Sequence, residues 1–351
     1  METKKNSKEV PMNKLPLLTW EKLILKLRNP FRLSYGVSET RQAFWIRLAN
    51  DEGWGEGTIP PYYGVDPDSM TAFWDAAAQR EDSLPESIEE IEPWVGLNGP
   101  APARCAVELA LYDRIARRRG LALWQLLDLP EPVSGATSFT IAIDTPEAMA
   151  RMAEQVKEFP VIKVKLGGDA EDEARLAAIR AARPDARLRI DANAGWMLDQ
   201  AKIYVQRMEA FDLEMIEQPL AKDAIEEMGL LQSQTSIPIV ADESVQTLAD
   251  VQRLADAGVG GINVKLMKVG GLTPALRLIR LARERGMRVM LGCMVETSLG
   301  TTAMAHLMGL AEWVDLDAPM LISNDPFEGV TYTEGARMAL PARPGIGVTL
   351  R

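Results

Sequence analysis

Histidine and cysteine are almost absent from this sequence of 351 residues, which contains one histidine and two cysteines, Cys105 and Cys293. A single histidine excludes a metal site built from several imidazoles and restricts any Ser-His-Asp or Cys-His arrangement to one residue. The two cysteines are far apart and form neither a CxxC motif nor a disulfide framework, which favours a reducing compartment. We therefore expect acid–base chemistry here to depend on lysine, aspartate, glutamate or tyrosine.

Long apolar runs and an excess of basic residues are also missing. No apolar run reaches the ~18 residues that a membrane helix needs. Residues 1–14 form a polar extension without the apolar region of a secretory signal. The net charge of −11 is unlike that of a nucleic-acid-binding protein. The sequence therefore predicts a cytoplasmic globular protein that acts on a small molecule, with no nucleic-acid or membrane partner.

Short β-rich segments recur along the last two-thirds of the chain, about 25 residues apart. Amphipathic segments with apolar residues three and four positions apart lie between them, as in helices. Alternating strands and helices predict a parallel sheet, and eight such units predict a TIM-like barrel. After Pro319 the chain is rich in glycine and proline and lacks an eighth helical segment. The predicted fold is therefore α/β, with a (β/α)7β modified TIM barrel over residues 131–319. The strands begin near residues 137, 161, 187, 213, 238, 261, 288 and 313.

The sequence of the N-terminal part predicts a second unit, which caps the barrel. Residues 15–130 open with strand-like segments at 18–28 and 42–51, followed by a Gly-rich turn and helical segments. We expect an α+β capping domain that residues 320–351 complete by returning to it. Two loops, at about 31–41 and 56–65, are expected to be mobile, as loops that carry function often are.

Charged residues stand at or just after the C-terminal ends of seven consecutive predicted strands. Charged side chains are rarely buried inside a barrel unless they are paired or bind a metal. Catalytic residues of such barrels lie at this end of the strands. The pattern therefore predicts an active site made from Lys163, Lys165, Asp191, Glu217, Asp242, Lys265, Glu296, Asp315 and Asp317.

Three carboxylates, Asp191, Glu217 and Asp242, end adjacent predicted strands. Carboxylate oxygens without histidine or cysteine are ligands for a hard cation, Mg²⁺ before Mn²⁺ or Ca²⁺. The alternative is that the three acids pair with lysines in a buried network of ion pairs. A network would not need three neighbouring acids in a row, so the pattern favours the metal.

Two lysines, Lys165 and Lys265, flank the three carboxylates from opposite sides. Positive charge from Lys163 and a metal would lower a lysine pKa from ~10.4 toward the range of a catalytic base. Two bases on opposite faces of one carbon perform a 1,1-proton transfer, and a metal-held carboxylate would stabilise the carbanion as an enediolate. The expected reaction is racemisation or epimerisation next to a carboxylate. Lys268, one turn further on, is expected to be structural.

The ordered motifs KVK, DAN, EQP, ADES and NVKLMKVGG resemble those of the enolase superfamily, muconate lactonizing enzyme subgroup, over about residues 15–350. The resemblance implies that Lys165 and Lys265 are the acid/base pair. It also implies that Asp191, Glu217 and Asp242 bind Mg²⁺, and that Lys163 helps to hold the substrate carboxylate. Further substrate-binding positions are Thr140, Cys293 and Val295, and we add Glu296 after strand seven.

Asp315-Leu316-Asp317, followed by Ala-Pro, is similar to the DxD signature of the dipeptide epimerases, such as the L-Ala-D/L-Glu epimerases. In those enzymes the two aspartates bind the free ammonium group of the substrate. Paired carboxylates opposite a metal-held carboxylate match the two charged ends of a dipeptide. The resemblance therefore implies Mg²⁺-dependent epimerisation of the C-terminal residue of a dipeptide.

The first cap loop departs from the Ala-Glu epimerases, which carry an arginine there that pairs with the glutamate side chain. Gly36 stands near that position, although Arg32 and Arg41 are close. The cap-loop tyrosines favour an apolar or aromatic second residue in the substrate instead. These tyrosines are Tyr35, Tyr62 and Tyr63.

Two groups of alternatives stay open. o-Succinylbenzoate synthase, muconate cycloisomerase and N-acylamino acid racemase share the lysines and the metal set, but their substrates lack a free ammonium group. Asp315 and Asp317 discriminate against these reactions. A catalytically silent binding protein on the same scaffold is the alternative of another class, and the complete acid/base and metal set argues against it. The resemblance also leads us to expect a homo-oligomer.

Overall fold

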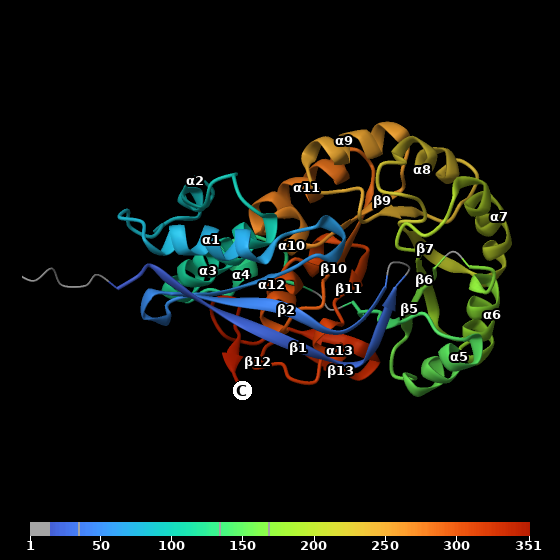
Figure 1. Cartoon of the computed structure of the whole chain (residues 1–351), viewed down its shortest axis with the longest axis horizontal. Helices are drawn as coiled ribbons and strands as arrows, with labels where there is room; N and C mark the ends of the chain where they lie inside the picture. Colours follow the sequence, from blue (N-terminus) through green and yellow to red (C-terminus); the bar gives the residue numbers. More distant parts are fainter. Residues whose placement is uncertain (1–14, 34–35, 133–134, 168) are drawn as a thin grey trace, which may run out of the picture.

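The computed structural model describes residues 15–33, 36–132, 135–167 and 169–351. A cap at one side carries a three-stranded antiparallel sheet, and eight parallel strands with their helices form the barrel at the other side (Figure 1). No helix in these ranges is long and apolar enough to cross a membrane.

The cap sheet has the strand order β1–β2–β3, and four helices accompany it. A long hairpin of its first two strands runs from the cap toward the barrel (Figure 1). The elements of the cap are β1 (Leu18–Leu33), β2 (Gly36–Leu48), β3 (Trp54–Thr58), α1 (Pro67–Ala78), α2 (Ile91–Val95), α3 (Ala101–Arg119) and α4 (Leu123–Leu126).

The prediction of a loop at residues 31–41 is wrong, because the described residues of this range belong to strands β1 and β2. Among the described residues of this hairpin, the register shifts between Lys26 and Phe31. Pro30 lies inside this irregularity and cannot donate a hydrogen bond to a neighbouring strand. The strands resume pairing beyond it, so the turn-forming residues bend the hairpin without ending it. The second expected loop begins later than predicted, after β3 ends at Thr58.

Alternate glycines let helix α3 lie directly on β3: Gly53, just before the strand, and Gly55 and Gly57 within it. A Cβ at Gly55 would come within 1.9 Å of the carbonyl oxygen of Ala106, and one at Gly53 within 2.1 Å of that of Ala110. Successive strand residues point to opposite faces. Glu56, between two of these glycines, is therefore directed away from α3.

The barrel agrees with the predicted (β/α)7β arrangement. Its eight strands follow one another in chain order, and each described pair is parallel. The first and last strands are joined by the bond from the Ser138 N–H to the Val314 oxygen, 3.2 Å. The strands are β4 (Phe139–Ile141), β5 (Val161–Lys165), β6 (Arg187–Asp191), β7 (Leu213–Glu217), β8 (Ile239–Ala241), β9 (Gly261–Val264), β10 (Arg288–Gly292) and β11 (Trp313–Asp315).

Helices follow the first seven barrel strands, and only a four-residue helix, α13 (Ala318–Leu321), follows the eighth. This confirms the absence of a full eighth helix. The others are α5 (Pro146–Gln155), α6 (Asp172–Ala182), α7 (Leu198–Met208), α8 (Ile225–Gln232), α9 (Leu248–Ala257), α10 (Leu266–Val269), α11 (Leu272–Glu284) and α12 (Ser298–Ala305).

The C-terminal tail lies against the cap. The Asn324 side chain bonds to the backbone of β1, accepting from the Lys26 N–H and donating to the Ile24 oxygen. The Phe327 ring packs against the rings of Trp45 and Trp54, at centroid distances of 5.1 and 5.9 Å. The tail strands are β12 (Phe327–Glu328), β13 (Thr331–Thr333), β14 (Arg337–Ala339) and β15 (Thr349–Leu350), which pair as β12–β15 and β13–β14.

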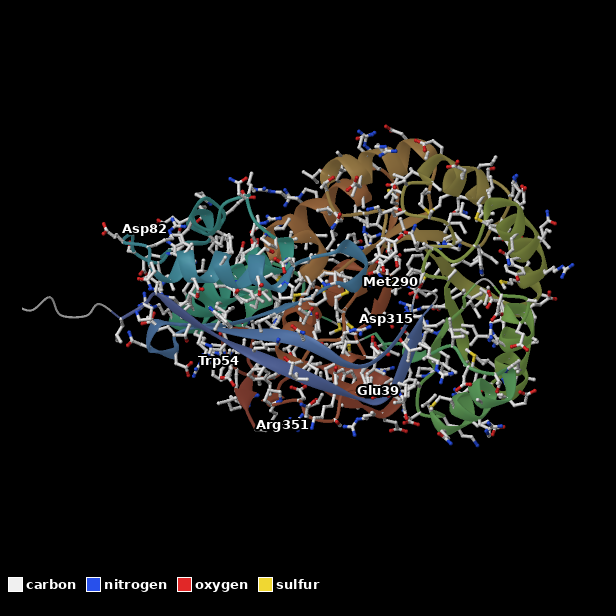
Figure 2. The ribbon with its side chains drawn as sticks, in the orientation of Figure 1. Glu39, Trp54, Asp82, Met290, Asp315 and Arg351 are labelled. Atoms are coloured by element: carbon white, nitrogen blue, oxygen red, sulfur yellow. The ribbon has the colours of Figure 1, made fainter. Side chains whose placement is uncertain are left out.

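A buried layer inside the barrel supports the charged strand ends. Met215, Val240, Met290 and Trp313 form one cluster. Three of them stand two residues before Glu217, Asp242 and Asp315, and so share the inward face of their strands with these acids. Figure 2 labels Met290 and Asp315 in this region. The packed layer closes the barrel below the acids, so that the acids open only toward the cap.

Candidate active site

A cavity lies at the C-terminal ends of the barrel strands, beneath the cap. Residues from β4, β5 and β11, and from the segments after β6, β8, β9 and β10, form its floor and one wall. The cap and α13 contribute the opposite wall. The lining residues are Arg41, Ile59, Pro60, Tyr62, Tyr63, Thr140, Lys163, Lys165, Asn193, Asp242, Glu243, Lys265, Cys293, Met294, Val295, Asp315, Asp317 and Leu321.

Lys163 is the central cation of the site. Its Nζ lies 3.1 Å from Asp191 Oδ2, 2.7 Å from Glu217 Oε2 and 2.7 Å from Asp315 Oδ2. Burial alone would lower the pKa of Lys163, but the carboxylates of Asp315, Glu217 and Asp191 raise it well above its usual value. Lys163 is therefore a fixed positive charge in the cavity wall.

The two expected acid/base lysines form ion pairs with different carboxylates. Lys165 Nζ is 2.5 Å from Asp191 Oδ2 and 3.0 Å from Asn193 Oδ1. Lys265 Nζ is 2.7 Å from Asp242 Oδ2. Burial acts to lower the pKa of Lys265, and the nearby carboxylates, Asp242 first, raise it above its usual value. In this arrangement Lys265 is held protonated, and its carboxylate partner would have to be neutralised before it could act as a base.

Lys268 lies beneath Asp242 and does not line the cavity. Its ammonium group donates to Asp242 Oδ1 and to the Asp242 backbone oxygen, both at 2.6 Å, and to the Asn263 oxygen at 2.7 Å. These contacts fit the structural role expected for it, because they fix both the side chain and the backbone of Asp242.

The three candidate metal ligands are buried at the ends of neighbouring strands, and Asp191 and Glu217 are direct partners in the β6–β7 register. Burial acts to raise the pKa of Asp191, but Lys165 and Lys163 lower it to about 2. Burial and the charge of Asp191 raise the pKa of Glu217 to about 7. Opposite pKa shifts of Asp191 and Glu217 are expected, because neighbouring carboxylates that repel one another share a small number of lysine cations.

The donor chemistry of this set fits Mg²⁺, since it offers carboxylate oxygens and neither histidine nor thiolate. In the described ranges the side chains form no ready-made cluster of three acidic, histidine or cysteine ligands. The carboxylate oxygens of Asp191 and Asp242 form ion pairs with the ammonium groups of Lys163, Lys165 and Lys265. A divalent cation bound by Asp191, Glu217 and Asp242 would take the place of some of these contacts.

The paired aspartates at the end of β11 are oriented by residues of β4 and the position just before it. The Ser138 hydroxyl donates to Asp315 Oδ1 at 2.5 Å, and the Thr140 N–H donates to Asp317 Oδ2 at 2.8 Å. Burial and the charge of Asp315 raise the pKa of Asp317 to about 7. An added cation, such as a substrate ammonium group, would stabilise the ionised form of Asp317. Thr140 thus contributes to the site through its backbone.

Residues after β10 divide into two groups. Cys293 and Val295 line the cavity, and Cys293 Sγ lies 3.3 Å from the Asp315 oxygen. Burial, together with nearby carboxylates, raises the pKa of Cys293 well above that of a free thiol, which disfavours the thiolate form. Glu296 is 3% exposed and is not part of the lining. Burial and Glu56 raise the pKa of Glu296, which lies next to the cap instead of the cavity.

Several lining residues were not among the expected site residues. Asn193 links two charged groups, because it accepts from Lys165 and donates to Glu243 Oε1 at 3.2 Å. The other oxygen of Glu243 is buried without a hydrogen-bond partner in the described part of the chain. Asn193 belongs to the DAN motif and Glu243 to the ADES motif, so their positions in these motifs could have indicated them.

The cap wall combines apolar and aromatic groups with one arginine. Tyr62 and Tyr63 lie edge to face at 5.8 Å, and the Tyr63 hydroxyl donates to the Glu243 backbone oxygen at 3.2 Å. Arg41 also lines the cavity, whereas Gly36 and Arg32 do not. The expected contribution of Tyr35 lies outside the described residues.

Comparison with known proteins identifies the family. Residues 147–351 match the enolase C-terminal domain-like family. The chain is 35% identical over 330 residues to the L-Ala-D/L-Glu epimerase of Bacteroides thetaiotaomicron, covering 92% of this chain and 85% of that protein. The chain belongs to the enolase superfamily, among its dipeptide epimerases.

Two other members of the superfamily differ in the dipeptides named for them. The hydrophobic dipeptide epimerase of Roseobacter litoralis is 32% identical, covering 93% of this chain and 96% of that protein. The dipeptide epimerase of Cytophaga hutchinsonii, whose crystal structure contains Mg and the dipeptide D-Ala-L-Val, superposes with a TM-score of 0.89 at 30% identity, covering 96% of each chain. Similarity to the dipeptide epimerases therefore establishes the class of enzyme, an isomerase, and leaves the preferred dipeptide open.

Proposed function

We propose that this enzyme is a Mg²⁺-dependent epimerase that inverts the α-carbon of the C-terminal residue of a dipeptide. The observation that carries the proposal is the cavity between Lys165 on β5 and Lys265 after β9, with Asp315 and Asp317 on its wall. Lysines on opposite sides match the two faces of one carbon, and the paired acids match a free ammonium group.

The charged ends of the substrate would be held at two places in the cavity. The carboxylate lies toward Lys163, and the ammonium group lies toward Asp317 and Asp315. Asp191, Glu217 and Asp242 would hold the metal ion. When bound, Mg²⁺ supplies positive charge next to the substrate carboxylate, which stabilises the negative charge that develops as the α-proton leaves.

Proton transfer is the work of the two lysines. One lysine, in its neutral form, removes the α-proton from one face, and the other, protonated, returns a proton to the opposite face. Asn193 holds Lys165, and Asp242 holds Lys265, so both ammonium groups approach the cavity from fixed directions. Reaction in the reverse sense exchanges their roles, which permits epimerisation in both directions.

The second side chain of the dipeptide would lie against the cap wall. Ile59, Pro60, Tyr62, Val295 and Leu321 present apolar and aromatic surface there. We therefore propose a preference for an apolar or aromatic C-terminal residue. These contacts come from the segment after β3, the segment after β10 and α13. The side chains there do not belong to the proposed acid/base or metal-binding sets, so their identity can set the preference for the second residue.

Arg41 supports a second candidate, a dipeptide whose C-terminal residue is acidic. Its guanidinium group would pair with a side-chain carboxylate in the same part of the cavity. The two candidates differ in the predicted effect of Arg41→Gln, which should reduce kcat/KM for Ala-Glu and leave that for Ala-Leu nearly unchanged.

Deuterium incorporation tests the reaction class and the substrate together. Purified enzyme with Mg²⁺ in D₂O is incubated with a set of L,L-dipeptides that vary in the second residue, and proton NMR locates the label. We expect deuterium at the α-carbon of the C-terminal residue, fastest with Leu, Phe or Tyr there. Faster exchange with Ala-Glu would favour the second candidate.

Other reactions of the superfamily are checked in the same assay with N-acetylated amino acids and with o-succinylbenzoate precursors. Turnover of these compounds above that of every dipeptide would overturn the proposal. Absence of label from every compound would favour a silent binding protein.

We also propose that the molecule forms a homo-oligomer in a reducing compartment, the cytoplasm. Both cysteines are free thiols in the structure, which supports the second part. Light scattering coupled to size-exclusion chromatography would measure the assembly.

A further inference from the structure

Glu56 is a cap residue whose side-chain carboxylate accepts hydrogen bonds from the barrel. It lies on β3 and is completely buried. Its Oε1 accepts the Thr297 N–H at 2.9 Å. Its Oε2 accepts the Thr297 hydroxyl and, at 2.9 Å, the Gly300 N–H. One carboxylate of the cap therefore binds the N-terminal turn of the barrel helix α12, where unpaired N–H groups and the helix dipole favour an anion.

The local sequence directs Glu56 toward this helix. Gly55 and Gly57 on either side face α3, and a Cβ at Gly57 would come within 2.9 Å of the Pro102 oxygen. The close approach of α3 leaves Glu56 only the opposite face of β3. The alternation of glycine and glutamate therefore serves the contact with the barrel as well as the packing of the cap.

The two segments that Glu56 joins continue directly into the two walls of the cavity. Three residues after Glu56 the chain reaches Ile59 and then Pro60, both in the lining. Two residues before Thr297 it reaches Val295, which lines the cavity from the barrel side. The contact between Glu56 and Thr297 is thus the point where the cap wall and the barrel wall are tied together.

We infer that Glu56 is a positioning residue for substrate recognition, because it fixes the spacing of the two walls that receive the second side chain of the dipeptide. This inference rests on the proposed function for its substrate. Loss of the contact lets the segment 59–63 separate from the segment 293–297. Binding of a large second side chain then weakens, while the lysines and the carboxylates at the strand ends keep their positions.

The tail provides a matched control at the same helix. Asp325 Oδ2 accepts the Ser298 N–H at 2.8 Å and the Ser298 hydroxyl at 2.6 Å, and its Oδ1 accepts the Phe327 N–H at 3.0 Å. Asp325→Asn therefore weakens another carboxylate contact to the start of α12 without touching the cap wall.

The kinetic experiment compares a small and a large second side chain. We measure kcat and KM for Ala-Ala and for the best large dipeptide in the wild type, Glu56→Gln, Thr297→Val, Thr297→Ser and Asp325→Asn. Glu56→Gln should raise KM for the large dipeptide about tenfold relative to Ala-Ala, with kcat for Ala-Ala nearly unchanged. Thr297→Val should act in the same direction, and Thr297→Ser, which keeps the hydroxyl donor, should behave as the wild type.

The double variant Glu56→Gln/Thr297→Val tests whether the two residues act through one contact. Its effect on the ratio of kcat/KM for the large dipeptide to kcat/KM for Ala-Ala should be smaller than the product of the effects of the two single variants. The inference would be overturned if Glu56→Gln reduced kcat/KM equally for small and large dipeptides, or if the effects of Glu56→Gln and Thr297→Val were independent. It would also be overturned if Asp325→Asn shifted the ratio of kcat/KM values as much as Glu56→Gln does.

Hydrogen exchange separates this inference from the proposed function, since it needs no substrate. Glu56→Gln should increase exchange at the Thr297 and Gly300 amides and, at the same time, in the segment 59–66. Increased exchange at α12 alone would contradict the coupling of the two walls. If Glu56→Gln does not fold, Thr297→Val, which removes the hydroxyl bond to Glu56 from the barrel side, is measured in its place. A wild type that exchanges no dipeptide α-proton would refute the proposed function, and the amide exchange would still decide the role of Glu56.

Discussion

At the residue scale, the site is a compact set of opposite charges in which each group depends on its neighbours. Lys163 contacts three carboxylates, and Asp242 receives both Lys265 and Lys268. Removing one partner of such a buried pair leaves the other without compensation, which costs more than the pair itself contributes. The chemistry therefore has to be tested with substitutions whose readout separates catalysis from folding.

The first prediction concerns the separate roles of the two lysines. Lys265→Ala should reduce inversion by about 1,000-fold. It should still allow exchange of the α-proton of one epimer, because Lys165 can remove and return a proton on the same face. Lys165→Ala should show the same behaviour with the other epimer. Proton NMR in D₂O, started from each epimer in turn, measures both rates. Inversion close to the wild-type rate in either variant would contradict a mechanism with two bases.

The second prediction concerns the ammonium site. Asp317→Asn removes a carboxylate whose pKa burial and Asp315 raise to about 7, and it keeps the acceptor for the Thr140 N–H. We expect kcat/KM for a dipeptide to fall about 10–100-fold, in line with the loss of a charged hydrogen bond. The wild type should discriminate strongly against the N-acetylated dipeptide, and the variant should have lost most of this discrimination. Discrimination of wild-type strength in the variant would show that another group reads the ammonium.

At the element scale, the barrel and its strand ends could be predicted because their signals are local. The repeated strand–helix pattern gives the eight strands within about two residues, since periodicity depends on neighbouring positions. The continuation of the β1–β2 hairpin through residues 31–41 could not be predicted, because the two neighbouring strands resume pairing beyond the turn signals around Pro30. The placements of Lys268 under Asp242 and of Glu296 beside Glu56 also depend on contacts between distant segments.

The third prediction concerns the packing of β3 against α3. Gly55→Ala would place a Cβ 1.9 Å from the Ala106 oxygen, so helix and strand must separate. We expect a loss of about 1–3 kcal/mol in the free energy of unfolding, as for overpacking of other cores. Urea denaturation measures this change. Gly135→Ala is the control, because nothing lies within 4 Å of a Cβ there, and its stability should stay close to that of the wild type.

At the scale of the whole molecule, buried carboxylates of the cap meet the starts of two barrel helices. Glu56 binds the start of α12. Glu108 on α3 points at the start of α11, where the Thr273 N–H lies 3.3 and 3.4 Å from its two oxygens. A Cβ at Gly271 would come within 1.6 Å of Glu108 Oε2, so this glycine leaves the space for the carboxyl group. The cap is thus joined to the barrel by polar contacts as well as by apolar packing.

The fourth prediction is a pH dependence of stability that comes from Glu108. Burial raises the pKa of Glu108 from 4.5 to about 7, against hydrogen bonds from Thr273 and the charge of Arg104, which lower it. Cys105 and Tyr112 are its other titratable neighbours. A raised carboxyl pKa means that the folded state binds the proton more tightly than the unfolded state. The stabilisation is therefore complete below about pH 4.5 and is lost as the pH rises through about 7.

The variant Glu108→Gln lacks this titration. Between about pH 5 and 8 the stability of the wild type should fall relative to that of the variant, by up to roughly 3 kcal/mol at about 1.4 kcal/mol per pKa unit. Urea denaturation at several pH values measures the difference. Glu92→Gln, which removes a partly exposed partner of Arg277 in the same interface, is the control. A wild-type stability that rises relative to Glu108→Gln over this range would show that the folded state favours the ionised carboxylate.

The return of the tail to the cap has a consequence for the order of synthesis. Trp45 and Trp54 belong to strands made early, and the ring that covers them, Phe327, is made almost 300 residues later. A growing chain exposes this aromatic surface until Phe327 has left the ribosome, and such surfaces favour aggregation. The barrel strands are translated before the cap is complete. We therefore expect that the cap is complete, and the active site closed, only after the tail segment around Phe327 has been made.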